Sequence, residues 1–201
     1  CVYFLEQALE QAGEKLDGKT CCISGAGNVA LYTAQKLLEK GAKVVSFSDS
    51  KGMVHIPDGI TEERLEELIQ IKEVEHGTLK DLCEDYDDCD YFEDKSPWGI
   101  ECDIAIPAAT QNEVDKKDAE KLKKNGVKWV CEAANMPLTE DATALLRGES
   151  CTILPGKAVN AGGVVAGLEH RHVGDPPQVL PGRLPVHPAI AVERLCARRG
   201  D

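Results

Sequence analysis

The segment that most constrains the fold of this chain is GAGNVA (residues 25–30), which follows the pattern G-x-G-x-x-A. The apolar run KTCCIS (19–24) precedes it, a helical pattern of alanines and leucines follows it, and the apolar run KVVSFS (43–48) comes next. This order is typical of a dinucleotide-binding strand–turn–helix unit. Gly25 would permit the tight turn, Gly27 would let a pyrophosphate approach the backbone, and Ala30 would pack the helix on the strand. The alternative is a strand–helix turn that binds no ligand.

Strand-like and helical segments alternate along most of the chain. We predict further strands at 103–107 and 151–155, a strand with its exit loop at 128–135, and helices at 2–12, 61–77, 115–126 and 139–148. Thr61 is expected to cap its helix, and Gly41 is expected to end the helix that follows the glycine turn. The alternation predicts an α/β, Rossmann-like fold, which is a doubly wound, mostly parallel sheet with helices on both faces.

The composition changes near residue 170. Residues 170–201 contain five of the ten prolines and five arginines against three acidic residues, whereas residues 1–169 carry a net charge of −14. We therefore expect a leading helix at 1–16, a dinucleotide-binding domain at 17–169 and a disordered tail at 170–201. A frame or splice artefact is the alternative for the tail. Because the chain begins at Cys1 and not at Met, we also expect it to be part of a longer protein.

The net charge of −12 argues against nucleic acid as the main partner, and no apolar run approaches the ~18 residues of a membrane span. Nine cysteines occur without a C-x-x-C pair. We interpret them as small buried hydrophobic residues in a reducing, cytoplasmic compartment, and we predict no metal site.

The acidic residue that follows the second strand is Asp49, within Ser48-Asp49-Ser50-Lys51. An acid at this position can accept hydrogen bonds from the adenosine ribose 2′-hydroxyl, which favours NAD. The neighbouring hydroxyls and lysine could instead hold a 2′-phosphate, which favours NADP. The local pattern alone leaves both cofactors open.

Three further motifs follow in order: PAATQNE (107–113), CEAANMP (131–137) and PGKAVNAGGV (155–164). Together with VYF (2–4), the glycine turn and SDS (48–50), they resemble the cofactor domain of hexameric-type glutamate dehydrogenases. The resemblance covers residues 2 to about 169. It implies that this region binds a nicotinamide dinucleotide.

The resemblance also implies roles for individual residues. It places Gly25, Gly27, Asn28 and Val29 at the pyrophosphate, and it favours NADP through Ser48, Asp49 and Ser50, with NAD as the alternative. Lys72 lies where such enzymes present a basic residue to the 2′-phosphate, although Glu75 and Thr78 stand where further basic residues are expected. The remaining implied contacts are with the nicotinamide end of the cofactor, through Ala109, Thr110, Gln111, Asn135 and Asn160.

The reaction implied by the resemblance is the oxidation of L-glutamate with NADP and water to 2-oxoglutarate, ammonia and NADPH, in a homo-oligomer, a hexamer by resemblance. The family's catalytic lysine and aspartate belong to a substrate domain that precedes the cofactor domain, so we assign no catalytic residue here. The alternative function is a stand-alone nucleotide-binding module without turnover.

Overall fold

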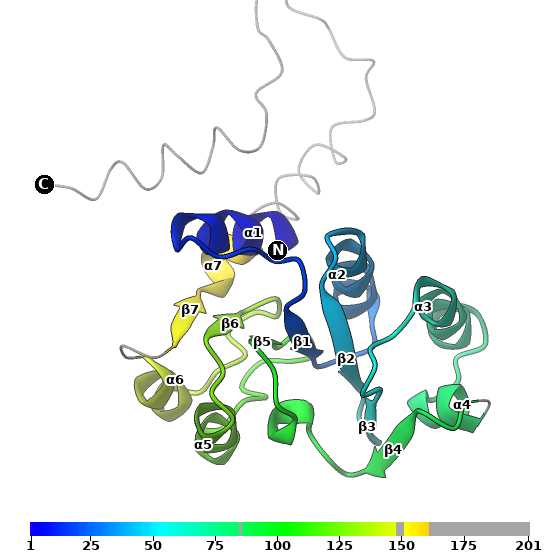
Figure 1. The fold of residues 1–201 in the computed structure, drawn as a ribbon. Coiled ribbons are helices and arrows are strands. Elements are labelled where there is room, and N and C mark those ends of the chain that lie inside the picture. Colours follow the sequence, from blue (N-terminus) through cyan, green and yellow to red (C-terminus); the bar gives the residue numbers. More distant parts are fainter. Residues whose placement is uncertain (85, 148–150, 161–201) are drawn as a thin grey trace, which may run out of the picture. The chain divides into compact units, whose positions relative to one another are not determined.

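The computed structural model describes residues 1–84, 86–147 and 151–160, and Cys1–Asn160 form one compact unit. Within these residues seven strands form one sheet in the order β4-β3-β2-β1-β5-β6-β7 (Figure 1). The strands β2, β1, β5, β6 and β7 are parallel, and β3 is antiparallel to both β2 and β4. Their bounds are β1 Thr20–Ile23, β2 Lys43–Ser48, β3 Gly52–His55, β4 Asp90–Glu93, β5 Ile104–Ile106, β6 Trp129–Cys131 and β7 Thr152–Leu154.

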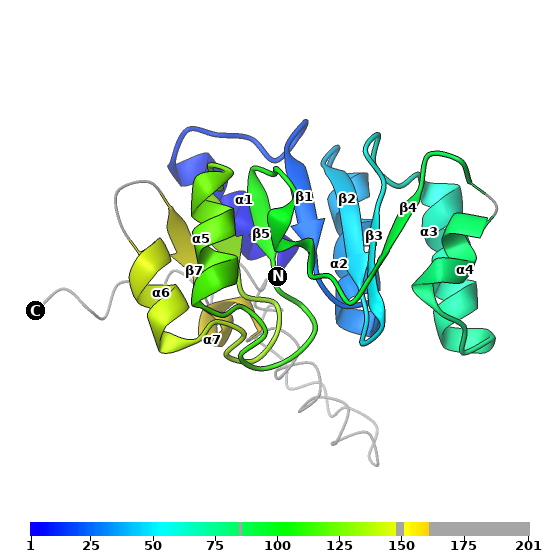
Figure 2. The same ribbon diagram turned by 90° about the horizontal axis from the view of Figure 1, so that it is seen from below.

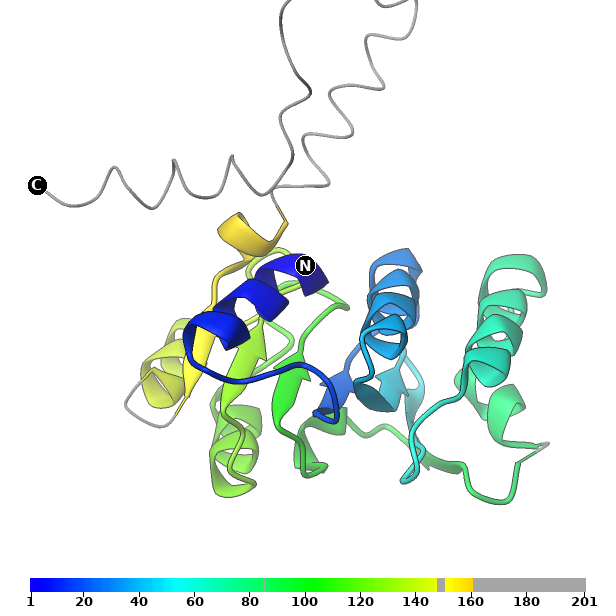
Figure 3. The ribbon, with the colours of Figure 1, turned by 45° about the horizontal axis from the view of Figure 1, so that its top comes forward.

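Helices cover both faces of the sheet. Figure 1 shows α1, α2 and α3 along one side and α5 and α6 along the other, and Figure 2 shows α5 and α6 in front of the sheet from below. In Figure 3, α2 and α3 lie side by side. The helices are α1 Val2–Gln11, α2 Asn28–Glu39, α3 Glu62–Ile69, α4 Leu79–Glu84, α5 Lys116–Lys124, α6 Glu140–Leu146 and α7 Gly156–Val159, with a π-helical turn η1 Gln70–Val74 and a 3₁₀ turn η2 Pro97–Gly99.

Two buried apolar clusters hold these layers together, one on each face of the sheet. The larger cluster lies between the sheet and α1 to α4 and contains Leu5, Leu31, Leu37, Phe47 and Leu68. The smaller cluster lies under α5, α6 and η2 and is centred on Trp98, Leu122 and Leu146. The predicted fold class, a doubly wound and mostly parallel sheet with helices on both faces, is confirmed.

Local signals in the sequence set several of the helix ends. Thr61 caps α3 by accepting the Arg64 amide at its Oγ1, 3.3 Å away, as the sequence predicts. Thr139 caps α6 through the Ala142 amide in the same way. Gly41 follows α2 with φ +79°, a left-handed conformation that favours glycine, so the predicted end of this helix is also confirmed.

The structure departs from the sequence prediction in the segment 52–93. The single helix predicted at 61–77 is α3 followed by the π-helical turn, and it ends by residue 75. Strands β3 and β4 and helix α4 were not predicted, because each spans only four to six residues and carries no clear periodicity. The strands β3 and β4 extend one edge of the parallel sheet, and of the two only β3 runs against the direction of the other strands.

One cysteine interpretation is wrong. Cys83 at the end of α4 and Cys89 just before β4 form a disulfide, with Cα atoms 5.0 Å apart. The return of the chain from α4 into β4 brings the two residues together, which their spacing in the sequence does not reveal. The other described cysteines are free, and all of them except Cys1 are buried.

Two further predictions concern a membrane span and the tail. No helix among the described residues is both long and apolar enough to cross a membrane. The predicted tail at 170–201 lies outside the described residues.

Candidate functional site

The candidate site lies where the order of the strands reverses. From β1 the chain moves to its neighbour β2 on one side, and later returns to β5 on the other side of β1. The loops that leave the carboxyl ends of β1 and β5 therefore lie side by side at this edge, and the chain continues from them into helices on opposite faces of the sheet, α2 and α5. In open α/β sheets a crevice at such a position is the usual ligand site.

The turn after β1 is built around Gly25. Its φ is +82°, and a methyl group added there would lie 3.0 Å from the Ala108 carbonyl oxygen and 3.2 Å from the Ala109 Cα. Glycine is thus required both by the backbone conformation and by the close approach of the loop after β5. The predicted tight turn at Gly25 is confirmed.

Gly27 has a different environment. It has extended backbone (φ −95°, ψ −178°) and caps the amino end of α2, and an added methyl group would meet no atom within 4 Å. Gly27, Asn28 and Val29 are exposed, while Ala30 is buried against the sheet. The first amides of a helix lack partners within the helix, and its dipole favours anions there. The turn therefore combines open space at Gly27 with the backbone N–H groups of the first turn of α2, which have no partner within the helix.

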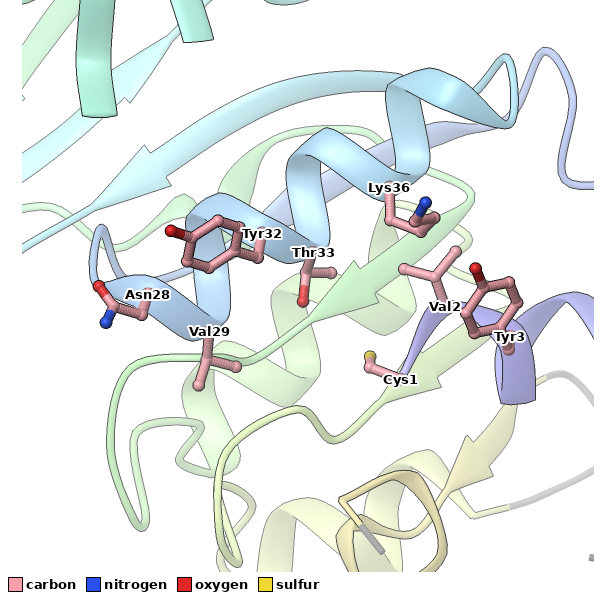
Figure 4. Close-up of a pocket in the computed structure, with 8 residues that line it drawn as sticks. All are labelled: Cys1, Val2, Tyr3, Asn28, Val29, Tyr32, Thr33 and Lys36. Carbon is pink, nitrogen blue, oxygen red and sulfur yellow. The ribbon is translucent and has the colours of Figure 1, made fainter. Parts of the chain in front are cut away.

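A cavity of about 350 Å³ adjoins this turn between α2 and the start of α1 (Figure 4). In Figure 4, Val29 and Thr33 lie on the side of α2 toward the start of α1, and Lys36 lies near Tyr3. The Lys36 ammonium is 5.9 Å from the centre of the Tyr3 ring. Of the predicted site residues, only Asn28 and Val29 line this cavity.

Ser48 supports the glycine turn from the next strand. Its side chain is buried, and its Oγ accepts the Gly25 amide at 3.0 Å, while its own amide donates to the Gly25 carbonyl at 3.3 Å. Ser24 supports the loop after β5 in a similar way, because its buried Oγ accepts a hydrogen bond from the Ala108 backbone amide at 2.9 Å. Ser24 was not predicted as a site residue, because its only signal in the sequence is a small polar residue at the end of an apolar strand.

Asp49 and Lys72 come together at the end of β2. The Lys72 Nζ lies 3.3 Å from Asp49 Oδ2 and donates to the Gly77 carbonyl at 2.9 Å. The other carboxylate oxygen of Asp49 accepts the Lys51 amide at 2.9 Å, which closes a tight turn. Ser50 and Lys51 in this turn are exposed. The structure thus places the predicted Asp49, Ser50 and Lys72 in one cluster.

Three loops meet at the other end of the site, after β5, β6 and β7. Asn112 donates its amide to the Met136 carbonyl at 3.0 Å, and the amides of Ala133 and Ala134 donate to the Pro107 carbonyl. The Asn160 Nδ2 donates to the Ala134 carbonyl at 3.2 Å. These bonds connect the loops that carry the remaining predicted residues. Of these, Ala109, Thr110, Gln111 and Asn135 are exposed and Asn160 is half-buried.

Glu113 organises the first of these loops and was also not predicted. Its Oε1 accepts the amides of Ala109 at 2.9 Å and Thr110 at 3.2 Å. Burial raises the pKa of the Glu113 carboxyl, and these two amide bonds oppose that shift. Glu113 therefore shapes the backbone whose outer surface carries Thr110 and Gln111.

The chain is similar in sequence to a known protein family and to individual proteins within it. The profile of the Glutamate/Leucine/Phenylalanine/Valine dehydrogenase family matches residues 1–171. The chain is 48% identical over 169 residues to an NADP-specific glutamate dehydrogenase of Haemophilus influenzae, covering 84% of this chain and 37% of that protein. A glutamate dehydrogenase of Bacteroides thetaiotaomicron is 46% identical, with 84% and 38% covered.

A solved structure of similar sequence has the same fold as this chain. The glutamate dehydrogenase of Plasmodium falciparum superimposes with a TM-score of 0.81 at 44% identity, covering 85% of this chain and 37% of that chain. The chain therefore spans a little over a third of the length of the relatives that it matches.

Proposed function

The chain belongs to the Glutamate/Leucine/Phenylalanine/Valine dehydrogenase family, and from this premise we propose that residues 17–169 are its dinucleotide-binding domain. Residues 1–16 form a leading segment that contains α1, and 170–201 form an atypical tail. The family implies a nicotinamide cofactor, whose chemistry is to carry hydride.

One observation carries this proposal: the turn at Gly25 and the loop at Ala108 meet where the strand order reverses. Gly27, next to them, leaves open space in front of the first amides of α2. A pyrophosphate fits such a position because it needs close backbone approach and N–H donors. We assign Gly25, Gly27, Asn28 and Val29 to this part of the cofactor.

NADP is the proposed cofactor. Close relatives are named NADP-specific, although one from Xylanibacter ruminicola is named NAD(P)-specific. The cluster of Asp49, Ser50 and Lys72 supplies a hydroxyl and a cation for a 2′-phosphate. We propose that Ser48 contributes indirectly, since its hydroxyl already accepts the Gly25 amide. Glu75 provides no second cation, so NAD is the alternative.

The nicotinamide end is assigned to the three loops joined by the Asn112 and Asn160 hydrogen bonds. We propose that Ala109, Thr110 and Gln111 adjoin the nicotinamide ribose, that Asn135 binds the carboxamide and that Asn160 lines the cleft. The exposure of Thr110, Gln111 and Asn135 supports this, because polar side chains there remain available to a ligand.

The proposed reaction of the complete enzyme is the interconversion of L-glutamate and 2-oxoglutarate with ammonia, in a homo-oligomer. Within it, this region would hold and orient the cofactor. No residue of this chain is assigned as a catalytic acid or base. We therefore expect the chain alone to bind cofactor without turning over glutamate, because positioned substrate and proton transfer are both lacking.

The test is calorimetric titration of the chain with NADP and with NAD, followed by an absorbance assay with NADPH, 2-oxoglutarate and ammonia. We expect tighter binding of NADP and no turnover. The Gly27→Val variant should bind neither cofactor, because its side chain would fill the open space. A chain that binds no nicotinamide nucleotide would contradict the proposal. Equal affinity for both would reject NADP selectivity.

A further inference from the structure

Tyr91 is an unassigned polar group at the end of the site where Asp49 lies. It belongs to β4, which runs antiparallel to β3 and therefore parallel to β2, so that β4 ends at the same edge of the sheet as β2. The Tyr91 ring is half-buried against the apolar cluster under α3 and α4. The ring is thus fixed by packing, while its hydroxyl extends toward the site.

Gly52 shows how far this hydroxyl reaches. A methyl group added at Gly52 would lie 2.9 Å from the Tyr91 hydroxyl oxygen and 2.3 Å from the Phe92 carbonyl oxygen. Glycine at this position leaves the phenol room to reach the turn at 49–52. The hydroxyl therefore lies beside the turn that carries Asp49, Ser50 and Lys51.

The turn itself is firmly held. The Asp49 amide donates to the Gly52 carbonyl at 2.9 Å, and the Asp94 amide at the end of β4 donates to the Lys51 carbonyl at 2.9 Å. Both oxygens of the Asp49 carboxylate are engaged, one by the Lys51 amide and one by Lys72. Groups around this turn therefore keep a fixed geometry relative to Tyr91.

The Tyr91 hydroxyl is suited to donate a hydrogen bond. Burial raises its pKa, and the nearby carboxylates of Asp49, Glu93 and Asp94 raise it further, so the phenol is protonated at neutral pH. No hydrogen bond joins it to another residue in the part of the chain that the structure describes. A protonated phenol beside the turn, whose Asp49 carboxylate is paired with Lys72, provides a donor for an anionic group.

We propose that the Tyr91 hydroxyl donates a hydrogen bond to the 2′-phosphate of the adenosine ribose and so helps the site to select NADP over NAD. The inference rests on the proposed function, because it assumes that the adenosine end of the cofactor lies at Asp49. NAD carries a hydroxyl in place of the phosphate, so the stronger, charge-assisted bond forms only with NADP.

The experiment compares Tyr91→Phe with the matched control Tyr86→Phe in the full chain. Tyr86 is a second half-buried tyrosine, but its hydroxyl donates to Glu67 at 2.7 Å within the protein. Dissociation constants are measured by calorimetry for NADP, NAD and the fragments adenosine 2′,5′-bisphosphate and 5′-AMP. Thermal unfolding of each variant verifies that it is folded.

We expect Tyr91→Phe to weaken NADP and adenosine 2′,5′-bisphosphate by about 10-fold to 100-fold, the usual effect of losing one hydrogen bond to a charged group. Affinities for NAD and 5′-AMP should stay the same, and Tyr86→Phe should change none of the four. Equal weakening of NADP and NAD, or no change in either, would overturn the role of Tyr91. If the wild-type chain bound NAD but not NADP, the role of Tyr91 would be overturned, but the proposed nucleotide site would stand. If the wild-type chain bound neither cofactor, the proposed function would be overturned as well.

Discussion

We predict that alanine in place of Gly25 destabilises the fold, whereas alanine in place of Gly27 leaves the fold stable and blocks the ligand. The same methyl group is added in both variants, two residues apart. At Gly25 it is forced into a left-handed conformation with φ +82° and lies 3.0 Å from the Ala108 carbonyl oxygen. At Gly27 the backbone is extended and the methyl group contacts nothing within 4 Å.

These contacts give different stability costs. The left-handed conformation costs an alanine ~1–2 kcal/mol, and an overpacked contact with backbone atoms costs ~1–3 kcal/mol more. Gly25→Ala should therefore lower the free energy of unfolding by about 2–5 kcal/mol. Gly27→Ala loses only the preference for glycine over alanine at a helix N-cap, which is about 1 kcal/mol or less.

Urea denaturation measures the difference, and the fluorescence of the buried Trp98 and Trp129 can follow it. With a slope of ~2 kcal/mol per molar urea, Gly25→Ala should lower the midpoint by roughly 1–2.5 M, and Gly27→Ala should stay near wild type. NADP titration should then show a large loss of affinity in Gly27→Ala despite its stable fold. If both variants were equally stable, the steric reasoning at Gly25 would be wrong. If Gly27→Ala bound NADP normally, no phosphate would lie against that residue.

Three further predictions concern bonds within the described residues. Reduction of the Cys83–Cys89 disulfide, which joins residues six apart, should lower stability by about 2 kcal/mol, and a Cys83→Ala/Cys89→Ala double variant should not respond to dithiothreitol; a wild type insensitive to reductant would argue against the bond. The pKa of the Glu113 carboxyl is raised above its ordinary 4.5 in the folded state, so the folded protein keeps the carboxyl proton to a higher pH than the unfolded chain does. The free energy of unfolding should therefore fall as pH rises above 4.5. Urea midpoints between pH 4.5 and 7 should show a weaker decline in Glu113→Gln, and identical slopes would contradict this. Finally, Ser46→Ala should cost ~1–3 kcal/mol in thermal or urea unfolding, because the buried Ser46 Oγ bonds the Ile23 amide at 3.1 Å where the β1–β2 register shifts; a neutral variant would mean that water or a backbone shift replaces the bond.

The features that could be predicted from the sequence are those with local causes. The glycine turn, the Thr61 cap and the helix end at Gly41 depend on residues within a few positions of one another, so their patterns are visible in the chain. The buried runs that form β1, β2 and β5 are likewise recognisable as short apolar segments between turns.

The features that could not be predicted depend on contacts between distant segments. The pairing of β3 with β4 joins residues about 40 apart, as in Gly52 opposite Glu93, and neither strand has a distinctive pattern of its own. The Cys83–Cys89 disulfide depends on that pairing, because the chain must return from α4 into β4 for the two residues to meet. Tyr91 was overlooked for the same reason: its place beside Asp49 follows from the antiparallel strands.

Ser48 shows why a motif can identify a site without distinguishing the roles of its residues. In the sequence, Ser48, Asp49 and Ser50 form one polar triplet after a strand. In the structure, Ser48 is the last residue of the buried strand β2, whereas Ser50 lies exposed in the turn that follows and Asp49 between them pairs with Lys72. The buried hydroxyl satisfies the Gly25 amide, which has no strand partner because the chain turns there. Thus one residue of the triplet builds the turn proposed to hold the pyrophosphate, and its neighbours lie where the adenosine ribose is proposed to bind.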